Sequence, residues 1–256
     1  MDLQLKDRVA LVAGSSRGIG RSIASALLRE GCRVSITGRD ATALEAANRE
    51  FRATSGDRVF ALAGDLTETS AIDAALNAVQ QQWGPPDILV ANLGNSSGTP
   101  GWHSVEEEWQ RLFNVNFFGT MRLAQAVIPR MQARGGSILF IASIAALEST
   151  PAPLPYSAAK AALVNYANNL SRLVAEQNIR VNCLAPGNIR FPGGNWERHL
   201  ENRRAQVEHY IATEVPQKRF GTPEEIAHFA AYLVSPLAAF ATGACYVMDG
   251  GQIRST

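Results

Sequence analysis

The chain has 256 residues, 46% of them hydrophobic, and a formal net charge of +1 at pH 7. This is the balance of a globular protein, and it gives no reason to expect a nucleic-acid or membrane partner. The 3 cysteines are scattered, which argues against a disulfide framework or a zinc site and is typical of a reducing compartment. Since no apolar signal segment is present and no stretch approaches the roughly 20 apolar residues of a membrane span, we expect a cytoplasmic protein.

Short β-rich runs alternate with longer helical patterns along the chain. Strands are predicted at 9–12, 33–37, 59–63, 88–91, 137–142, 180–184 and 245–248. Helical spacing occurs at 19–30, 41–54, 69–83, 105–134, 156–177 and 223–234. The alternation indicates βαβ units, and the nearly continuous apolar strands indicate that helices cover both faces of a parallel sheet. We therefore expect one α/β domain over residues 1–256, built on a doubly wound sheet of about seven strands.

Two segments interrupt this alternation. Residues 95–103 are rich in Gly, Ser and Pro, which predicts a loop. Residues 191–213 separate the sixth strand from the last long helix, and after Pro192-Gly193-Gly194 they become charged and helix-prone. An insertion at the carboxyl end of a strand is where a cover over a ligand would lie, so this segment is predicted to form a small helical lid.

A glycine-rich turn, Gly14-Ser15-Ser16-Arg17-Gly18-Ile19-Gly20, follows the first strand. Glycines permit a tight turn and a close approach to a pyrophosphate, and the next helix offers free N–H groups to the anion. The spacing differs from the standard dinucleotide motif, and a turn without a ligand is the simpler alternative. The same residues match the nucleophile elbow of hydrolases, but only about a dozen residues precede them, too few to supply an oxyanion loop. A dinucleotide site is the preferred interpretation.

The residue after the second strand distinguishes NAD from NADP, because an acid there holds a free ribose 2′-hydroxyl and an arginine accommodates a 2′-phosphate. Arg39 occupies this place, and together with Arg17 it could clamp a phosphate, so NADP(H) is predicted. Alternatively, Arg39 is a solvated residue and Asp40 caps the next helix, or Asp40 binds the ribose of NAD(H), the second choice. Asp65, after the third strand, could accept the adenine amino group or act as a helix cap.

Tyr156 and Lys160 are one helical turn apart, and Ser143 ends the fifth predicted strand. An ammonium at i+4 favours the phenolate and lowers its pKa from the ordinary value of about 10, which makes the tyrosine a candidate general acid/base. Such a pair alone is weak evidence, because it should occur by chance in roughly one of every few chains of this length. Asn92 and Gly94 follow the fourth strand, at the edge of the sheet where ligands bind.

Taken together, these motifs resemble the short-chain dehydrogenase/reductase family over nearly the whole chain. The motifs that match in order and spacing are Gly14-x-x-x-Gly18-x-Gly20, Asp65, Asn92-x-Gly94, Asn116, Ser143, Tyr156-x-x-x-Lys160, Pro186-Gly187 and Asp249-Gly250-Gly251. Residues 215–226 and 241–243 are most similar to 3-oxoacyl-acyl-carrier-protein reductases, although sugar, polyol and steroid dehydrogenases share this tail. The resemblance implies a Rossmann-type fold and a homotetramer in which segments 105–134 and 156–177 pack across one interface.

The resemblance also implies a mechanism. Tyr156 would protonate a carbonyl oxygen as hydride arrives from a nicotinamide, with Ser143 donating a hydrogen bond to the developing alkoxide. Lys160 would lower the pKa of Tyr156 and hold the nicotinamide ribose, and Asn116 would anchor a water. Without the resemblance, Asn116 would be read as a helix-interior residue bonded to backbone and Ser143 as a strand-end cap. The implied cofactor residues are Gly14, Ser16, Arg17, Gly18, Ile19, Gly20, Arg39, Asp65, Leu66, Asn92, Gly94, Tyr156, Lys160, Pro186, Gly187 and Ile189; no metal is expected.

The chain departs from the family pattern at Phe191, where a threonine often contacts the nicotinamide amide. Phe191 cannot donate that hydrogen bond, which leaves the backbone of Ile189 or a different lid closure to serve instead. The substrate pocket is expected within residues 95–102, 144–155 and 191–210, with Leu147, Leu154, Phe191 and Trp196 suited to an apolar chain and Glu148, Arg198, Arg203 and Arg204 to polar groups.

These features predict an NADPH-dependent enzyme that interconverts a carbonyl and a secondary alcohol, with a 3-oxoacyl thioester or a similar ketone as the preferred substrate. A sugar, polyol or steroid-type alcohol dehydrogenase is the alternative. A catalytically silent dinucleotide sensor on the same fold is an alternative of another class. A sensor would be expected to lose Tyr156 or Lys160, and both are present.

Overall fold

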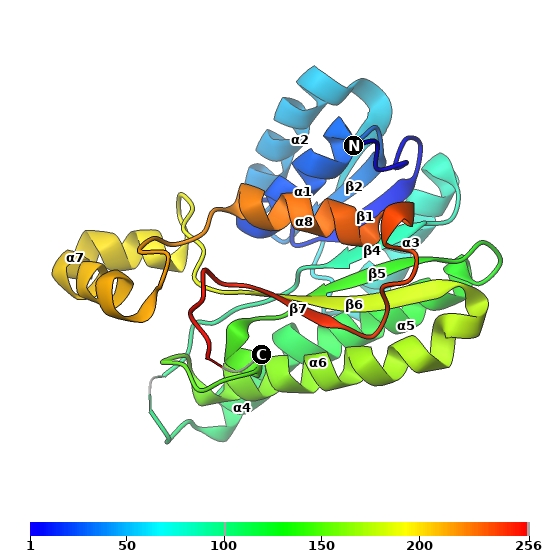
Figure 1. Ribbon diagram of the computed structural model, residues 1–256. Coiled ribbons are helices and arrows are strands. Elements are labelled where there is room, and N and C mark those ends of the chain that lie inside the picture. The colour runs from blue at the N-terminus through cyan, green and yellow to red at the C-terminus, as the bar shows by residue number, and fades with distance from the viewer. Residues whose placement is uncertain (100, 255–256) are drawn as a thin grey trace.

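The computed structural model describes residues 1–99 and 101–254, so Pro100 of the predicted loop and the last two residues lie outside it. Its centre is a parallel sheet with strand order β3-β2-β1-β4-β5-β6-β7 (Figure 1). The strands are β1 (Val9–Ala13), β2 (Arg33–Gly38), β3 (Val59–Ala63), β4 (Ile88–Ala91), β5 (Gly136–Ile141), β6 (Ile179–Pro186) and β7 (Cys245–Met248). The predicted doubly wound parallel sheet is confirmed.

Helices cover both faces of this sheet (Figure 1). They are α1 (Gly18–Arg29), α2 (Ala41–Ser55), α3 (Thr69–Trp83), α4 (Glu106–Phe113), α5 (Gly119–Met131), α6 (Leu154–Val174), α7 (Asn195–Glu214) and α8 (Pro223–Val234). Helices α1, α2 and α8 pack on one face, and α3, α5 and α6 pack on the other. Among the described residues, no helix is both long and apolar enough to cross a membrane.

The strands are continuous apolar runs because each contributes to two cores at once. In β1, Ala10 and Val12 belong to the core under α1 and α8, whereas Val9, Leu11 and Ala13 belong to the core under α3 and α5. Successive side chains of a strand point to opposite faces, so both sets must be apolar when both faces are covered. This burial holds the strand ends, and the loops that follow them, in fixed positions.

The order of the strands reverses beside β1, since the chain builds outward to β2 and β3 and then returns to place β4 on the other side. Ala13 at the end of β1 lies beside Ala91 at the end of β4 in the strand register. The two loops leaving these strands diverge to opposite faces and open a crevice, which is where open parallel sheets bind ligands. The glycine-rich turn and Asn92 both begin at this point.

The predicted helix over 105–134 is interrupted. Helix α4 ends at Phe113, a π-helical segment spans Asn114–Phe118, and α5 continues to Met131. A π segment inserts an extra residue into the helical turn, and the spacing of apolar residues does not reveal it. The segment is stabilised locally by Asn116, whose side-chain amide donates to the carbonyl of Leu112 at 2.9 Å.

Helix α7 occupies the predicted lid segment and extends beyond the sheet, at the left of Figure 1. It bends at Arg203, where the backbone is not helical. Its apolar residues form a small cluster of their own with the following loop, made of Leu200, Val207, Val215 and Phe220 with Trp196, Tyr210 and Ile211 packed against it. The lid segment is therefore held to the sheet through fewer core contacts than the other helices are.

Candidate active site

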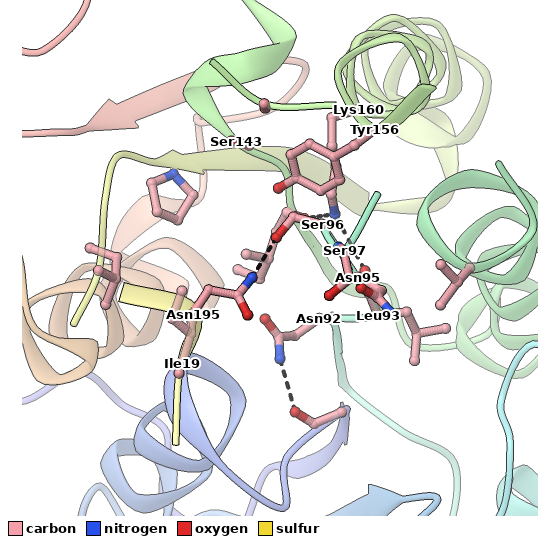
Figure 2. Close-up of a pocket in the computed structure, with 18 of the residues that line it drawn as sticks. Ile19, Asn92, Leu93, Asn95, Ser96, Ser97, Ser143, Tyr156, Lys160 and Asn195 are labelled. Carbon is pink, nitrogen blue, oxygen red and sulfur yellow. Dashed lines mark hydrogen bonds between the residues drawn. The ribbon is translucent and has the colours of Figure 1, made fainter. Parts of the chain in front are cut away.

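A pocket of about 690 Å³ lies at the carboxyl ends of the strands, between the sheet and the segment after β6. Most of the predicted site residues line it: Gly14, Ser16, Arg17, Ile19, Arg39, Asp65, Leu66, Asn92, Gly94, Ser143, Tyr156, Lys160, Pro186, Gly187 and Ile189. Figure 2 shows Tyr156, Lys160 and Ser143 at one side of the pocket and Ile19 and Asn195 at the other. Gly18, Gly20 and Asn116 do not line it, and their contacts place them behind its wall.

The glycine-rich turn has room for a ligand only because its glycines lack side chains. Gly14 and Gly18 have φ of 64° and 57°, the left-handed region that glycine adopts without strain. A Cβ on Gly20 would lie 2.3 Å from the carbonyl oxygen of Gly14, so only glycine allows α1 to approach the turn. The turn is also held to β4, because the Asn92 amide donates to the Gly14 carbonyl at 2.9 Å (Figure 2).

The N-terminus of α1 faces this turn without a side-chain cap and without an acidic residue in its first turn. Its free N–H groups and the positive end of the helix dipole are therefore available to an anion. A pyrophosphate fits the cradle that the glycines leave, so the turn suits the predicted dinucleotide.

Arg39 lies at the pocket wall and forms an ion pair with Asp65, with 3.7 Å between Nη1 and Oδ2. Asp65 in turn accepts hydrogen bonds from the backbone N–H and the hydroxyl of Thr67. Asp40 caps α2 by accepting from the Ala43 N–H at 3.0 Å, which agrees with the capping interpretation of this residue. Arg39 is exposed and directly follows Gly38, the last residue of β2.

Arg17 does not join Arg39 in this structure. Its guanidinium donates to the carbonyl of Gly193 at 3.4 Å. Gly193 lies in the short stretch between β6 and α7, which we call the hinge of the lid segment. The ring of Phe191 also packs against Gly18, where an added Cβ would lie 2.7 Å from the ring. The clamp of Arg17 and Arg39 on a cofactor phosphate stays a prediction, and in this structure the Arg17 guanidinium bonds to the lid segment.

Tyr156 stands in the first turn of α6, with Ser143 facing it from the end of β5 (Figure 2). Burial raises the pKa of Tyr156 above its ordinary value, and a hydrogen bond with Ser143 opposes this rise. Ser143 is also held by the backbone, since its hydroxyl oxygen accepts from the Ala145 N–H at 3.2 Å. A protonated phenol that lines the pocket beside a hydroxyl can donate a proton to an oxygen atom bound between them.

Lys160 is 3% exposed, and burial lowers its pKa to about 8. Its ammonium donates to the Ile141 carbonyl at 2.8 Å and to the Leu93 carbonyl at 3.3 Å. The expected lowering of the Tyr156 pKa by Lys160 does not appear in this structure, where burial dominates. The reason is geometric, because the lysine reaches past the tyrosine to carbonyl groups at the ends of β4 and β5.

Asn116 ties the loop after β4 to the π-helical segment. Its side-chain oxygen accepts from the Asn95 N–H at 3.1 Å, and its amide donates to the Asn95 carbonyl at 2.9 Å. Gly94 separates it from Lys160, since an added Cβ would lie 3.2 Å from the asparagine oxygen and 3.4 Å from the lysine nitrogen. These bonds match the simpler interpretation of Asn116 as a residue satisfied by backbone, and they hold the wall behind Lys160.

Sequence reasoning named the pocket segments but missed several individual residues in them. The Asn195 amide donates to the Ser96 hydroxyl at 2.9 Å, which joins α7 to the loop after β4 across the pocket (Figure 2). The Asn188 amide donates to the Tyr210 hydroxyl at 3.1 Å. No motif marks such residues, because each bond joins segments far apart in the sequence.

The residues predicted to bind substrate separate into two groups. Phe191, Trp196 and Arg198 line the pocket, whereas Leu147, Leu154, Glu148, Arg203 and Arg204 are not among its lining residues. The carboxylate of Glu148 instead accepts from the Arg254 N–H at 2.9 Å. The pocket wall also includes polar side chains that were not singled out, namely Ser96, Ser97, Asn195 and His199.

Comparisons with known proteins agree with this geometry. The family model described as enoyl-(acyl carrier protein) reductase matches residues 13–252. The chain is 32% identical to the 3-oxoacyl-[acyl-carrier-protein] reductase FabG of Chlamydia muridarum, over 98% of this chain and 100% of the relative. It is also 32% identical to 2-(S)-hydroxypropyl-CoM dehydrogenase 3 of Xanthobacter autotrophicus, over 98% and 99% of the two chains.

Among solved structures, the L-sorbose reductase of Gluconobacter frateurii complexed with NADPH and L-sorbose has a TM-score of 0.93 and 33% sequence identity, with 100% of both chains covered. A 7α-hydroxysteroid dehydrogenase complexed with NADH and 7-oxo glycochenodeoxycholic acid has a TM-score of 0.90 and 29% identity, covering 99% of this chain and 97% of the other. The matches cover 97% or more of each chain. The chain belongs to the short-chain dehydrogenase/reductase family of oxidoreductases.

Proposed function

We propose that this protein is an NADPH-dependent reductase that interconverts a carbonyl group and a secondary alcohol, and that residues 1–256 act as a single dinucleotide-binding domain. The observation that carries the proposal is that Ser143, Tyr156 and Lys160 line the same pocket as the glycine-rich turn. A proton donor and a nucleotide cradle thus share one cavity, as hydride transfer requires.

The residues present fit a nicotinamide dinucleotide. The turn from Gly14 to Gly20 and the uncapped start of α1 would hold the pyrophosphate, and Arg39 would hold a 2′-phosphate. Asp65 and Leu66 would border the adenine, and Pro186, Gly187 and Ile189 would border the nicotinamide. When bound, the cofactor supplies the hydride. The choice of NADPH over NADH rests on Arg39, because Asp40 is already used as a helix cap.

The side chains of this chain would supply the proton and stabilise the charge. The raised pKa keeps the Tyr156 hydroxyl protonated near neutral pH, so it can protonate the carbonyl oxygen of a bound ketone. Ser143 would hydrogen-bond the same oxygen as negative charge develops on it. Lys160 would hold the ribose, and Asn116 would keep the wall behind Lys160 in place, where a relay water could bind.

For the substrate, we propose a 3-oxoacyl thioester or a similar ketone, since two FabG relatives match 98% and 97% of this chain. A sugar or polyol is the second candidate, and the polar wall formed by Ser96, Ser97, Asn195 and His199 favours it. These groups would hydrogen-bond hydroxyls along a short carbon chain. A silent dinucleotide sensor is less well supported, because Tyr156 and Lys160 both remain in the pocket.

We also propose that the protein assembles as a homotetramer, with the segments 105–134 and 156–177 packing against their counterparts in a second subunit. Aromatic side chains gather along these segments, where Phe117 contacts Phe113, Phe118 and Tyr166. Phe118 is 41% exposed, which is a large apolar exposure for a residue in such a cluster. Analytical ultracentrifugation would test the assembly.

A substrate panel run with both cofactors tests the proposed activity. The purified protein is mixed with NADPH or NADH and with acetoacetyl thioesters, ketoses, small ketones and a steroid ketone, and the loss of reduced-cofactor absorbance is followed. We expect turnover with at least one ketone and a preference for NADPH. The matched control is Tyr156→Phe, which keeps the ring but removes the proton donor. Cofactor binding without turnover across the panel, unchanged in that variant, would support the sensor instead.

A further inference from the structure

Two cysteines face each other across the last two strands of the sheet. Cys183 of β6 is the direct partner of Cys245 of β7 in the parallel register. Neighbouring strands lie about 4.8 Å apart, and disulfides span Cα separations of roughly 4.4 to 6.8 Å, so this pair is within bonding range. The two side chains also point to the same face, since both belong to the core between the sheet and α6.

The position of β7 in the sheet favours a small adjustment of this pair. Strand β7 is the last in the sheet order and pairs only with β6 in the described structure. A strand held on one side can shift slightly without breaking a second ladder of hydrogen bonds. The short length of β7, Cys245–Met248, reinforces this freedom.

The two thiols differ in exposure and in acidity. Cys183 is buried and Cys245 is partly exposed. The interaction between the two thiols lowers the pKa of Cys245, and the same interaction, together with burial, raises the pKa of Cys183. Cys245 is therefore the better nucleophile and the thiol that a small oxidant can reach. Cys183 is placed to attack the oxidised sulfur of Cys245 and close a disulfide.

The pair lies beside the candidate active site. Cys183 pairs in register with Phe140 of β5, and the Lys160 ammonium donates to the carbonyl of the next residue of that strand, Ile141, at 2.8 Å. Three residues further along β6, Pro186 enters the pocket wall and pairs with Met248 of β7. A change in the spacing of β6 and β7 at Cys183 is therefore transmitted both to Lys160 and to the loop that begins at Pro186.

We propose that Cys183 and Cys245 form a redox-modification site, at which hydrogen peroxide oxidises the two thiols to a disulfide that lowers the reductase activity. In the first step the Cys245 thiolate attacks a peroxide oxygen, the O–O bond breaks and hydroxide leaves, which gives a sulfenic acid. In the second step the sulfur of Cys183 attacks this sulfur, the S–O bond breaks and water leaves with the Cys183 proton. Two electrons and two protons pass from the thiols to the peroxide, which becomes two water molecules.

The test measures the thiols directly. The full-length protein is treated with hydrogen peroxide, the remaining thiols are alkylated, and the unreduced peptides are mapped by mass spectrometry. We expect a peptide pair joined through Cys183 and Cys245 that is lighter by two hydrogen atoms and that dithiothreitol separates. Cys32→Ser is the matched control, because Cys32 is buried and burial raises its pKa to about 12, so its loss should not change the product.

Two further variants separate the steps. In Cys183→Ser, the oxidised Cys245 should remain a sulfenic acid that dimedone traps, because the resolving thiol is absent. In Cys245→Ser, the buried Cys183 should stay reduced. The proposal is overturned if peroxide carries Cys245 of the wild type to a sulfinic acid while Cys183 remains free for alkylation.

The effect of the disulfide on activity rests on the proposed function. It is measured by ketone turnover, independently of the peptide mapping. Oxidised wild type should turn over a ketone several-fold more slowly and recover in dithiothreitol, whereas Cys245→Ser should keep its rate in peroxide. A wild type that forms the disulfide and loses no activity would overturn the link to the active site. If the protein reduces no ketone at all, the proposed function fails, but peptide mapping still decides whether the disulfide forms.

Discussion

The two walls of the pocket are built differently. Tyr156 and Lys160 lie on α6, and Ser143 follows β5; both elements belong to the main core, and Lys160 is 3% exposed. The opposite wall is α7 and its hinge, which pack mainly on their own small apolar cluster and bend at Arg203. The wall that carries Ser143, Tyr156 and Lys160, here called the core wall, is thus positioned by burial. The lid wall, formed by α7, is attached to the rest of the protein by a few polar bonds.

This difference explains why one scaffold can serve several substrates. Groups that transfer a proton must be held within a narrow range of positions, which a packed core provides. A wall attached by few contacts can change its side chains without disturbing the sheet. We therefore expect substitutions in the core wall to act on the chemical step and on stability, and substitutions in the lid to act on substrate binding.

The largest effect should come from Tyr156→Phe. The phenyl ring keeps the packing of α6 but cannot give a proton to the carbonyl oxygen, so kcat should fall by roughly 10²- to 10⁴-fold. Steady-state kinetics with the best ketone from the panel would measure this, and cofactor affinity should change little. If the variant keeps most of its kcat, the proton comes from another group and the core wall does not carry out the chemical step.

A second prediction concerns the buried charge of Lys160, whose pKa of about 8 lies below its ordinary value. Between pH 8 and about 10.5 the unfolded chain binds this proton and the folded chain does not, so stability rises with pH in that window. Below pH 8 the burial of the ammonium costs stability, and the cost disappears as the pH rises.

The free energy of unfolding of the wild type relative to Lys160→Met should therefore increase by up to about 3 kcal/mol across this window. Urea unfolding of both proteins without cofactor, at several pH values, measures the difference. Because the two chains share all other titrating groups, subtraction removes their contribution. A difference that does not vary with pH would mean that Lys160 is not desolvated by the core wall.

Arg39→Asp should have a smaller effect, confined to the cofactor. Loss of a charge-assisted bond to a 2′-phosphate removes about 1.5 to 3 kcal/mol, which is roughly 10- to 150-fold in affinity for NADPH. The variant should bind NADH at least as well as the wild type, because its carboxylate can accept from the free ribose hydroxyl. Titration of both reduced cofactors by fluorescence measures the ratio. If that ratio is unchanged, Arg39 does not select the cofactor.

The smallest effect is expected from Asn195→Ala, which removes the 2.9 Å bond between the lid and Ser96. A neutral hydrogen bond contributes about 0.5 to 1.5 kcal/mol, so KM should rise by roughly 2- to 12-fold with kcat nearly unchanged. Ser96→Ala is the matched control, because it breaks the same bond from the other side. A large loss of kcat in either variant would mean that the lid contributes to the chemical step. The proposed difference between the two walls would then be wrong.

Much of the fold could be predicted because it follows from local patterns. The apolar strands and the helices between them lie close to the predicted positions, except that the predicted helix over 105–134 is interrupted by the π-helical segment. The predicted family and parallel sheet are confirmed on this basis. The spacing of Tyr156 and Lys160 likewise placed both on one face of α6 and in one pocket.

Other features could not be predicted because they depend on pairs of residues far apart in the chain. Arg17 was predicted to bind a phosphate together with Arg39, and in the structure its guanidinium donates to the Gly193 carbonyl of the lid segment. Lys160 was expected to act on Tyr156, but its ammonium reaches the carbonyls of Leu93 and Ile141. Each of these partners comes into reach only when separate segments fold together.

The sequence by itself determined which groups are present and on which element each lies, because strand and helix periodicity and the conformational freedom of glycine are local properties. Only the tertiary structure decided which partner each group bonds and how far burial shifts its pKa, since both depend on neighbours brought by other strands. The same rule applies to Cys183 and Cys245, which are scattered in the sequence and become direct partners in the sheet.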